Sequence, residues 1–394
     1  MTWPNVPIGD VIQSSQYGLS IPAKPNGLLP IVGMKGIQDG RVSIDVDVCV
    51  DLTDEEAHDY LLADGDILLN RTNSPDLVGK AGIYRGTGKA VFASYLVRLQ
   101  LDRTRVDPDF VIQLLASDGG QRNIKQLATR AISQANLNPT TFKKHFYIPL
   151  PDLGTQVSIK DILLAWDSAT EKTERLIRLR GKQKAWLLRK VVSATGQIVK
   201  LREILKQVSR PVPKPIEPYW ALGIRSHGKG TFQRFVADPA SVDMEVLYAV
   251  ARDELIVNIT FAWEGAIAAV KPEDERCLVS HRFPTYEVNC QIADPLFMKY
   301  IVNHKAFFSQ LALISPGGAG RNRVLNKKDF LKLAISLPPL SEQKRFAQTL
   351  GSLDSLIEKE RSLLASLKVQ KRGLMQKLLT GEWRLKEHDL EAAE

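Results

Sequence analysis

The sequence predicts an α+β protein with two globular domains in a pseudo-twofold repeat, separated by two long antiparallel coiled-coil helices. Three observations predict this fold class. The second half of the chain repeats the first at an offset of about 187 residues. Each half ends in a stretch whose apolar residues alternate in steps of four and three, which is the spacing of a coiled-coil seam. The segments before these stretches are rich in short β-like runs bounded by turns.

The repeat is clearest where each predicted helix begins. Residues 148–156 (IPLPDLGTQ) correspond to residues 335–343 (ISLPPLSEQ). The pairs Asp107-Pro108 and Asp294-Pro295 also match. So long a period does not belong to a solenoid, so it indicates a duplicated module. Two similar modules present a pseudo-twofold surface, and the commonest target of such a surface is double-stranded DNA with two half-sites.

The elements follow in order along each half. The β-like runs of the first half fall at residues 67–69, 81–84 and 95–99, and those of the second half at 255–260 and 266–270. Residues 107–115 and 294–308 have helical patterns, and residues 210–215 (RPVPKP) predict an extended linker. The predicted boundaries are 1–152 for the first domain, 153–199 for the first helix, 200–337 for the second domain, 338–384 for the second helix and 385–394 for a tail.

The two seams predict helices of about 35–40 residues that pack on each other, because a lone helix of this length is marginal in water. Ser341 is the predicted N-cap of the second helix, which should stop near Thr380-Gly381. The seam of the second helix consists of Phe346, Leu350, Leu353, Ile357, Glu360, Leu364, Leu367, Lys371, Leu374 and Leu378. The seam of the first helix, 187 residues earlier, consists of Ile159, Leu163, Trp166, Thr170, Thr173, Ile177, Arg180, Lys184, Leu187 and Val191.

Composition restricts the class of protein. The chain of 394 residues has 44% hydrophobic residues, which is ordinary for a globular protein of two or more domains. Its formal net charge is +9, and the segment 172–214 alone holds 13 Lys and Arg against 2 Asp and Glu, so this segment is expected to face phosphates. The three cysteines are far apart, and neither a signal peptide nor an apolar run of membrane-spanning length is present. We therefore expect a cytoplasmic location.

Several motifs together resemble the specificity subunit of Type I restriction–modification enzymes. They are Gly65–Ser74 (GDILLNRTNS) with Val78-Gly79-Lys80 in the first half, and 337–345 (LPPLSEQKR) with 373–381 (GLMQKLLTG) in the second. The resemblance covers nearly the whole chain. The first helix departs from it, since Asp152 and Gly154-Thr155 stand where the second repeat has Pro339 and Ser341-Glu342.

The resemblance implies a DNA-reading role without catalysis. It implies two target-recognition domains that each read one half of a bipartite site, and helices that space these domains and dock partners. The implied partners are two modification subunits, which bind S-adenosylmethionine and methylate adenine, and two restriction subunits, which hydrolyse ATP, translocate DNA and cut it. No cofactor is expected on this chain itself, since S-adenosylmethionine, ATP and Mg belong to the partner subunits.

Two segments come near to catalytic motifs. Residues 138–142 (NPTTF) lack the second proline of an amino-methyltransferase motif and are one residue too long. Residues 223–230 (GIRSHGKG) approach a P-loop, but Gly230 stands where a Ser or Thr should ligate magnesium, so a basic loop on DNA phosphate is favoured. We expect no catalytic residue and no metal site. The alternatives are a self-contained nuclease or nucleotide hydrolase, and a scaffold that does not read sequence.

Side chains that suit DNA contact occur at similar places in both halves. Arg, Asn and Gln read base edges, and Lys and Arg hold phosphates. The candidates in the first half are Lys35, Arg41, Arg71, Asn73, Lys80, Tyr95, Lys125, Arg130 and Gln134. Those in the second are Arg225, His227, Lys229, Arg234, His281, Arg282, Arg321, Asn322 and Arg323, and the alignment places Tyr95 opposite His281.

Other residues are assigned to helix docking or to structure. We expect the helices to bind the modification subunits through Trp166, Leu353, Leu367 and Leu374. Asn70 and Asn258 match in both halves at strand ends, which favours a structural role, and Trp263 is a predicted core residue.

Overall fold

The computed structural model describes residues 3–86, 88–131, 134–192, 196–316 and 323–385. The chain forms two compact units. Unit 1 comprises Met1–Glu174 with Ser362–Glu394, and unit 2 comprises Arg175–Arg361. The helices α5 (Leu153–Val192) and α10 (Leu340–Leu379) contain 40 residues each, and each unit holds one half of both helices. The α+β class and the repeated domain organisation predicted from the sequence are confirmed.

A six-stranded sheet is the centre of unit 1. Its order is β2 (Ile12–Tyr17), β11 (Leu96–Leu101), β7 (Ile67–Asn70), β9 (Ala81–Ile83), β5 (Gly40–Val42) and β4 (Ile37–Gln38). The sheet is antiparallel from β2 to β9, with Val97 opposite Tyr17 and Leu69, and β5 joins β9 in parallel. Every residue of β7 and β9 is buried, which explains their continuous apolar runs.

Smaller sheets complete unit 1. They are β1 (Asn5–Pro7) with β14 (Tyr147–Pro149), then β10 (Val91–Phe92), β3 (Leu29–Val32) and β6 (Cys49–Val50), and finally β12 (Thr129–Arg130), β13 (Ala135–Asn136) and β8 (Thr72–Asn73). The helices α2 (Pro108–Ala116), α3 (Asp118–Leu127) and α4 (Pro139–His145) pack into one core with the central sheet. This core also holds Ile159 and Leu163 of α5 and Leu378 of α10, so both long helices are anchored in unit 1.

Unit 2 repeats this plan and adds a larger second sheet. Its first sheet has the order β16 (Leu205–Val208), β24 (Thr285–Val288), β21 (Leu255–Val257) and β22 (Ile267–Ala269). The second has the order β17 (Pro211–Pro213), β20 (Val246–Ala249), β23 (Cys277–Val279), β18 (Tyr219–Ile224) and β19 (Thr231–Val236). β15 (Gln197–Lys200) pairs with β25 (Ala334–Leu337). The predicted linker thus contains an edge strand, because Pro211–Pro213 pairs with β20.

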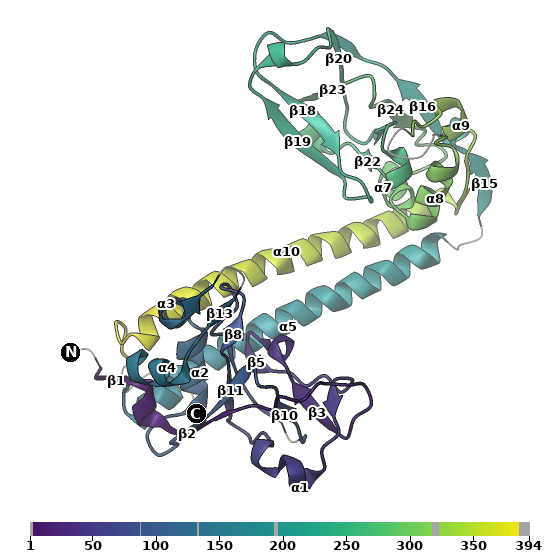
Figure 1. Ribbon diagram of the computed structural model, residues 1–394. Coiled ribbons are helices and arrows are strands. Elements are labelled where there is room, and N and C mark those ends of the chain that lie inside the picture. Colours follow the sequence, from purple (N-terminus) through teal and green to yellow (C-terminus); the bar gives the residue numbers. More distant parts are fainter. Residues whose placement is uncertain (1–2, 87, 132–133, 193–195, 317–322, 386–394) are drawn as a thin grey trace. The chain divides into compact units, whose positions relative to one another are not determined.

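The helices of unit 2 correspond to those of unit 1, as Figure 1 allows the reader to follow. α7 (Pro295–Val302), α8 (Lys305–Leu313) and α9 (Lys327–Phe330) follow the first sheet along the chain. The single helical pattern predicted for residues 294–308 is two helices, since His304 caps α8 and ends the preceding turn. The core around these helices includes Val191 of α5 and Ala347 of α10.

The repeat extends to individual hydrogen bonds. Gln156 and Gln343 are buried, and each amide oxygen accepts the backbone N–H of the Asp that caps an earlier helix, which is Asp107 of α2 at 2.9 Å or Asp294 of α7 at 3.0 Å. Each amide nitrogen donates to two backbone carbonyls, which are those of Arg105 and Pro151, or of Ile292 and Pro338. These glutamines therefore fix both globular domains to their helices by the same contacts.

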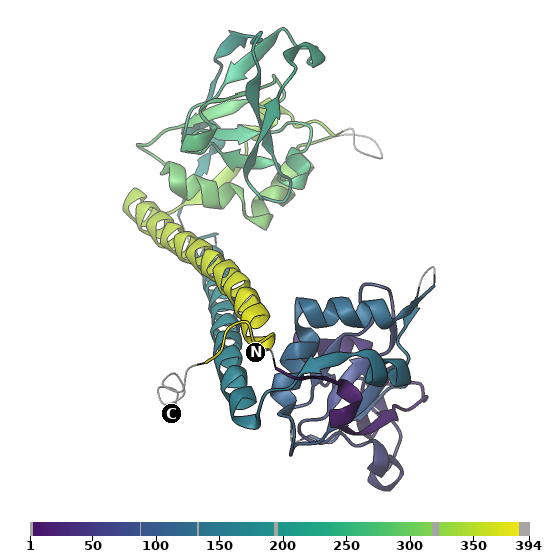
Figure 2. The same ribbon diagram turned by 90° about the vertical axis from the view of Figure 1, so that its left-hand side faces the viewer.

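The helix pair is antiparallel within each unit, and Figures 1 and 2 show the two helices side by side. In unit 1, Lys371 pairs with Asp167 at 2.5 Å and Lys368 with Glu174 at 2.7 Å. In unit 2, Arg180 pairs with Glu360 at 2.6 Å, and Lys184 pairs with Asp354. All predicted seam positions of both helices are buried or partly buried, so the predicted seam is confirmed. Part of the basic charge of segment 172–214 is therefore neutralised inside the pair.

The predicted N-cap of α10, Ser341, is wrong by two residues, because the N-cap position is Pro339. The carbonyl of Pro339 accepts the backbone N–H groups of Glu342 and Gln343, at 2.9 and 3.0 Å, so the helix starts at Leu340 and Ser341 lies within its first turn. The predicted stop is confirmed, because α10 ends at Leu379 and Gly381 has φ +74°. Among the helices that the structure describes, none is long and apolar enough to span a membrane.

Candidate nucleic-acid interface

The loops at one end of the central sheet form the same backbone arrangement in both units. In unit 1 the N–H of Arg71 donates to the carbonyl of Tyr95 at 3.0 Å, and the N–H of Leu137 donates to the carbonyl of Arg71 at 2.7 Å. In unit 2 Ile259 donates to Arg282 at 3.0 Å, and Leu325 donates to Ile259 at 2.8 Å. The structural counterpart of Tyr95 is therefore Arg282, which corrects the alignment with His281 by one residue.

This loop arrangement gathers many of the unit 1 candidates. The small sheet β12-β13-β8 places Asn73 opposite Ala135, beside the segment that carries Gln134. Arg71 donates to the carbonyl of Ser94 at 3.2 Å and to the side chain of Asn136 at 3.5 Å. Its guanidinium also lies 5.0 Å from the centroid of the Tyr17 ring. Both Tyr17 and Tyr95 are about half exposed, so this surface combines an arginine with two aromatic rings.

The remaining unit 1 candidates lie at various distances from this cluster. Lys80 is exposed beside it, since the N–H of Asn70 donates to the carbonyl of Lys80 at 2.8 Å. Lys125 lies on α3 and Lys35 in the short helix η2 (Met34–Gly36). Arg41 on β5 instead forms an ion pair of 3.2 Å with Glu171 of α5. Arg130 belongs to β12, and its side chain lies outside the described part of the chain.

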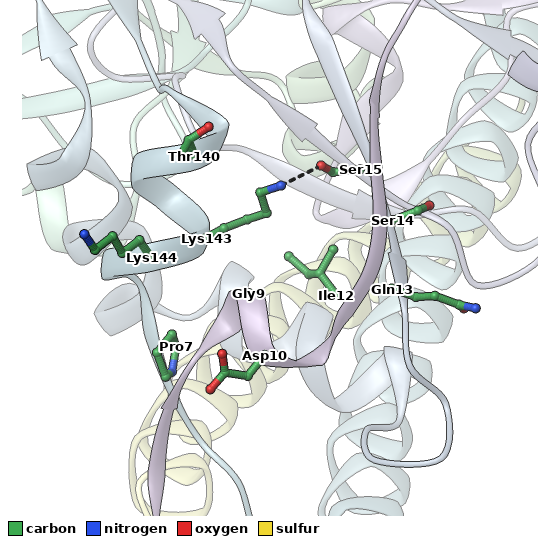
Figure 3. A pocket seen from close by; sticks show the side chains of 10 residues that line it. All are labelled: Pro7, Gly9, Asp10, Ile12, Gln13, Ser14, Ser15, Thr140, Lys143 and Lys144. Atoms are coloured by element: carbon green, nitrogen blue, oxygen red, sulfur yellow. Dashed lines mark hydrogen bonds between the residues drawn. The ribbon is translucent and has the colours of Figure 1, made fainter.

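The described residues of unit 1 line a groove and a smaller pocket. A groove of about 1240 Å³ runs between β5, α2 and the helix pair, and the Arg41–Glu171 and Lys371–Asp167 ion pairs line it. A smaller open pocket of about 610 Å³ lies between β2 and α4, where Lys143 donates to Ser15 at 3.1 Å and Lys144 lies at the rim (Figure 3). Both lysines suit a phosphate contact, and the sequence analysis did not nominate them.

The unit 2 candidates form two groups. One group surrounds the loop arrangement, where His281 and Arg282 are exposed and the guanidinium of Arg323 lies 5.3 Å from the centroid of the Trp263 ring. Trp263 is partly buried and its indole N–H donates to the carbonyl of Thr260, so the predicted core position is wrong. Arg321 and Asn322 lie outside the described residues.

The second group lies on the β18–β19 hairpin, where Arg225, His227, Lys229 and Arg234 are all exposed. Its turn is fixed by backbone conformation, since His227, Gly228 and Gly230 have φ of +61°, +66° and +79°. The turn is also attached to the domain, because the N–H groups of His227 and Gly228 donate to the carbonyls of Glu264 and Gly265 at 2.7 and 3.1 Å. The hairpin therefore holds the backbone that carries these basic side chains in a fixed conformation.

The structural context of this turn differs from that of a nucleotide-binding loop. In a P-loop the glycine-rich segment leads from a strand into a helix whose N-terminus holds phosphates. Residues 223–230 instead join two antiparallel strands. Asn138 is likewise a helix cap, since its side chain accepts the N–H groups of Thr140 and Thr141 at 2.8 and 3.2 Å. Within the described ranges, no group of three or more His, Cys, Asp or Glu residues could hold a metal ion.

The four predicted docking residues of the helices lie in the seam rather than on an outer face. Leu353 is 6% exposed, while Trp166, Leu367 and Leu374 are partly buried. The apolar side chains that α5 exposes in unit 2 are Leu176, Leu179 and Trp186, which are 45%, 50% and 51% exposed. The apolar spacing did not indicate this stripe, because other positions of α5 already satisfied the seam pattern.

The comparisons with known proteins decide the family. The family model of the "Type I restriction modification DNA specificity domain" matches residues 1–179 and 248–369, which is more than half of the chain. The chain belongs to this family. A protein described as the MjaX type I restriction enzyme specificity subunit, from Methanocaldococcus jannaschii, is 25% identical over 98% of this chain and 94% of its own length. The MjaVIII type I restriction enzyme specificity subunit of the same organism is 22% identical over 98% and 93%.

Solved structures of low sequence identity share the fold of this specificity-domain protein. The type I restriction–modification S subunit from M. genitalium has a TM-score of 0.60 at 15% identity, with 96% of each chain covered. A chain from a structure on the assembly and conformational transition of the type I R-M system has a TM-score of 0.52 at 15% identity, with 97% of this chain and 98% of that chain covered. These matches span both units, in agreement with the duplicated plan.

Proposed function

We propose that this chain is the DNA-specificity subunit of a Type I restriction–modification complex, in which each recognition domain reads one half of a bipartite duplex site. The observation that carries the proposal is the repeated loop arrangement, Arg71–Tyr95–Leu137 in unit 1 and Ile259–Arg282–Leu325 in unit 2. The backbone is the same in both units, but the side chains differ. Such an arrangement suits two readers that occupy equivalent positions on two different half-sites.

Base reading and phosphate binding fall to the candidate residues of both units. The Arg71–Tyr17 cluster and Asn73 are the proposed base contacts of unit 1, and Lys80, Lys125, Lys143 and Lys144 are proposed phosphate contacts. Arg41 is the weakest candidate, because Glu171 already neutralises it. Catalysis belongs to the partners in this proposal, and S-adenosylmethionine, ATP and Mg bind there. This chain contributes sequence recognition.

The proposed docking surface for the modification subunits is the exposed stripe of Leu176, Leu179 and Trp186. The ring of Trp186 carries the ammonium of Lys190 at 4.5 Å from its centroid, so the stripe combines apolar area with positive charge. Leu179→Glu should abolish binding of a modification subunit while the melting temperature stays unchanged. Leu313→Glu is the matched control, because Leu313 is a leucine that is 85% exposed and belongs to α8, not to either long helix.

Selection from a random duplex library tests the reading function itself. The full-length chain should enrich a bipartite site, with two short conserved ends and an unconserved gap. A gel shift should then show tighter binding to the selected duplex than to a random one at the same salt concentration, because nonspecific affinity depends on salt. Equal binding of both duplexes would favour the scaffold hypothesis. ATP hydrolysis by the purified chain would revive the enzyme hypothesis.

A further inference from the structure

In the β18–β19 hairpin of unit 2, a partly exposed aromatic ring lies over a glycine of the neighbouring strand. Phe232 lies opposite Gly223 in the register of the two strands. A Cβ at Gly223 would overlap the ring of Phe232, so the ring lies directly on the backbone of the neighbouring strand. Phe232 nevertheless remains 36% exposed, which is unusual for a phenylalanine with a core available. The ring is therefore held in place while part of it faces solvent.

An arginine is held on the same ring. The guanidinium of Arg225 lies 5.0 Å from the centroid of the Phe232 ring, and it donates to the carbonyl of Thr231 at 3.3 Å. Stacking and this hydrogen bond fix the plane of the guanidinium before any ligand binds. Arg225 is exposed and forms no ion pair with a carboxylate of the described residues, so it keeps donors for a ligand. Arg225 and Phe232 therefore form one preassembled unit, in which the guanidinium is the polar part and the ring the apolar part.

The surroundings point to duplex DNA as the ligand. β19 is the edge strand of its sheet, and β18 pairs with β23 on its other side only at Trp220 and Ala221, so residues 222–224 and 231–233 form a two-stranded ribbon at the margin of unit 2 (Figure 1). A two-stranded ribbon fits the major groove, where arginine recognises guanine and phenylalanine contacts the thymine methyl group. Lys229 and Arg234 are exposed on the same hairpin and supply positive charge for phosphates. The hairpin lies between the two segments that the family model matches.

We propose that Arg225 and Phe232 act as one base-reading unit in the major groove, with the guanidinium on a guanine and the ring edge on the methyl group of an adjacent thymine. This inference rests on the proposed function. It assigns a guanine next to a thymine to the half-site that unit 2 reads. It also explains why a bulky ring is placed over Gly223, since the glycine leaves room for the ring to lie flat and orient Arg225.

Duplex selection with the full-length chain and three variants tests the assignment. Phe232→Ala should weaken binding to the selected site by about 5- to 50-fold and relax the preference at the thymine and the adjacent guanine, while the other half of the site is unchanged. Gly223→Ala should give the same relaxation with the ring still present, because the new methyl group displaces it. Phe235→Ala is the matched control, since Phe235 is 53% exposed on the same strand but packs on Trp220, on the opposite face of the ribbon.

A chemical probe makes the test independent of the variants. Deoxyuridine in place of the assigned thymidine removes only the methyl group of the base. This replacement should weaken DNA binding by the parent chain and leave DNA binding by the Phe232→Ala variant unaffected. The inference is overturned if the selected half-site has no adjacent thymine and guanine, if Phe232→Ala selects the parent site, or if it relaxes both halves equally. These results leave the proposed function standing, whereas no bipartite site for the parent chain removes both.

Discussion

A charge placed in the helix seam should unfold the part of the protein that the seam supports. Leu353 of α10 is 6% exposed and lies between the buried residues Leu350 and Ile357. Leu353→Asp removes about 1.5–3 kcal/mol of apolar burial and adds a carboxylate that must be desolvated or must open the seam. We expect a loss of about 3–5 kcal/mol in the free energy of unfolding. For a unit of this size each kcal/mol lowers the melting temperature by about 2–4 °C.

The assay is thermal melting followed by circular dichroism, with two controls on the same helix. Leu353→Met conserves apolar volume and should change stability by less than about 1.5 kcal/mol. Leu363→Asp introduces the same charge on an exposed position, since Leu363 is 51% exposed, and should change it by about 0.5 kcal/mol or less. Equal melting temperatures for Leu353→Asp and the parent would refute the packed seam. Leu367→Asp should be milder than Leu353→Asp because Leu367 is only partly buried.

The remaining predictions concern the ion pairs, a buried tyrosine, the modules and the spacer. Asp167→Asn should destabilise the chain by about 1–3 kcal/mol, because the partly buried Lys371 loses its carboxylate partner. A double-mutant cycle with Lys371→Met should show coupling between the two residues. Burial raises the pKa of Tyr286 to about 12, so the folded state favours the neutral phenol and stability should fall as pH rises from about 10 to 12; Tyr286→Phe should remove this loss. Exchanging residues 1–150 for the equivalent domain of a relative should change one half of the recognised site only, as base-resolved methylation mapping would show. Four residues inserted between Glu171 and Leu176 add about 6 Å of helix and should lengthen the gap by one or two base pairs, and an unchanged gap with full activity would mean that the helices do not set it.

Local patterns predicted the helices well because their signal is periodic and repeated. The seam positions could be read from spacing alone, and the repeat supplied a second copy of each signal. The start of α10 was misplaced because a proline carbonyl, rather than the Ser341 side chain, satisfies the first turn. The break before α8 was missed because its apolar pattern continues across His304. Boundaries of this kind depend on single hydrogen bonds that composition does not reveal.

The interface was harder to predict because it depends on contacts between distant strands. Arg71 and Arg225 could be nominated by type, but their aromatic partners Tyr17 and Phe232 could not. Tyr17 lies 54 positions before Arg71. The position of Phe232 follows only from the strand register, which places it opposite Gly223. The alternation of β19 (TFQRFV) was the available signal, since it places Phe232 and Arg234 on one face. Asn70 is fully buried at the end of β7, and its side-chain amide has no hydrogen-bond partner among the described residues, so the structural role predicted for it stays a prediction.

The most direct test of the two-reader account is methylome sequencing of a host that expresses this chain with a modification subunit. The account predicts one recurring methyl-adenine motif with two short conserved ends and a gap of fixed length. About one helical turn of DNA should separate the centres of the two ends. A single uninterrupted motif, or methylation without any recurring sequence, would contradict it.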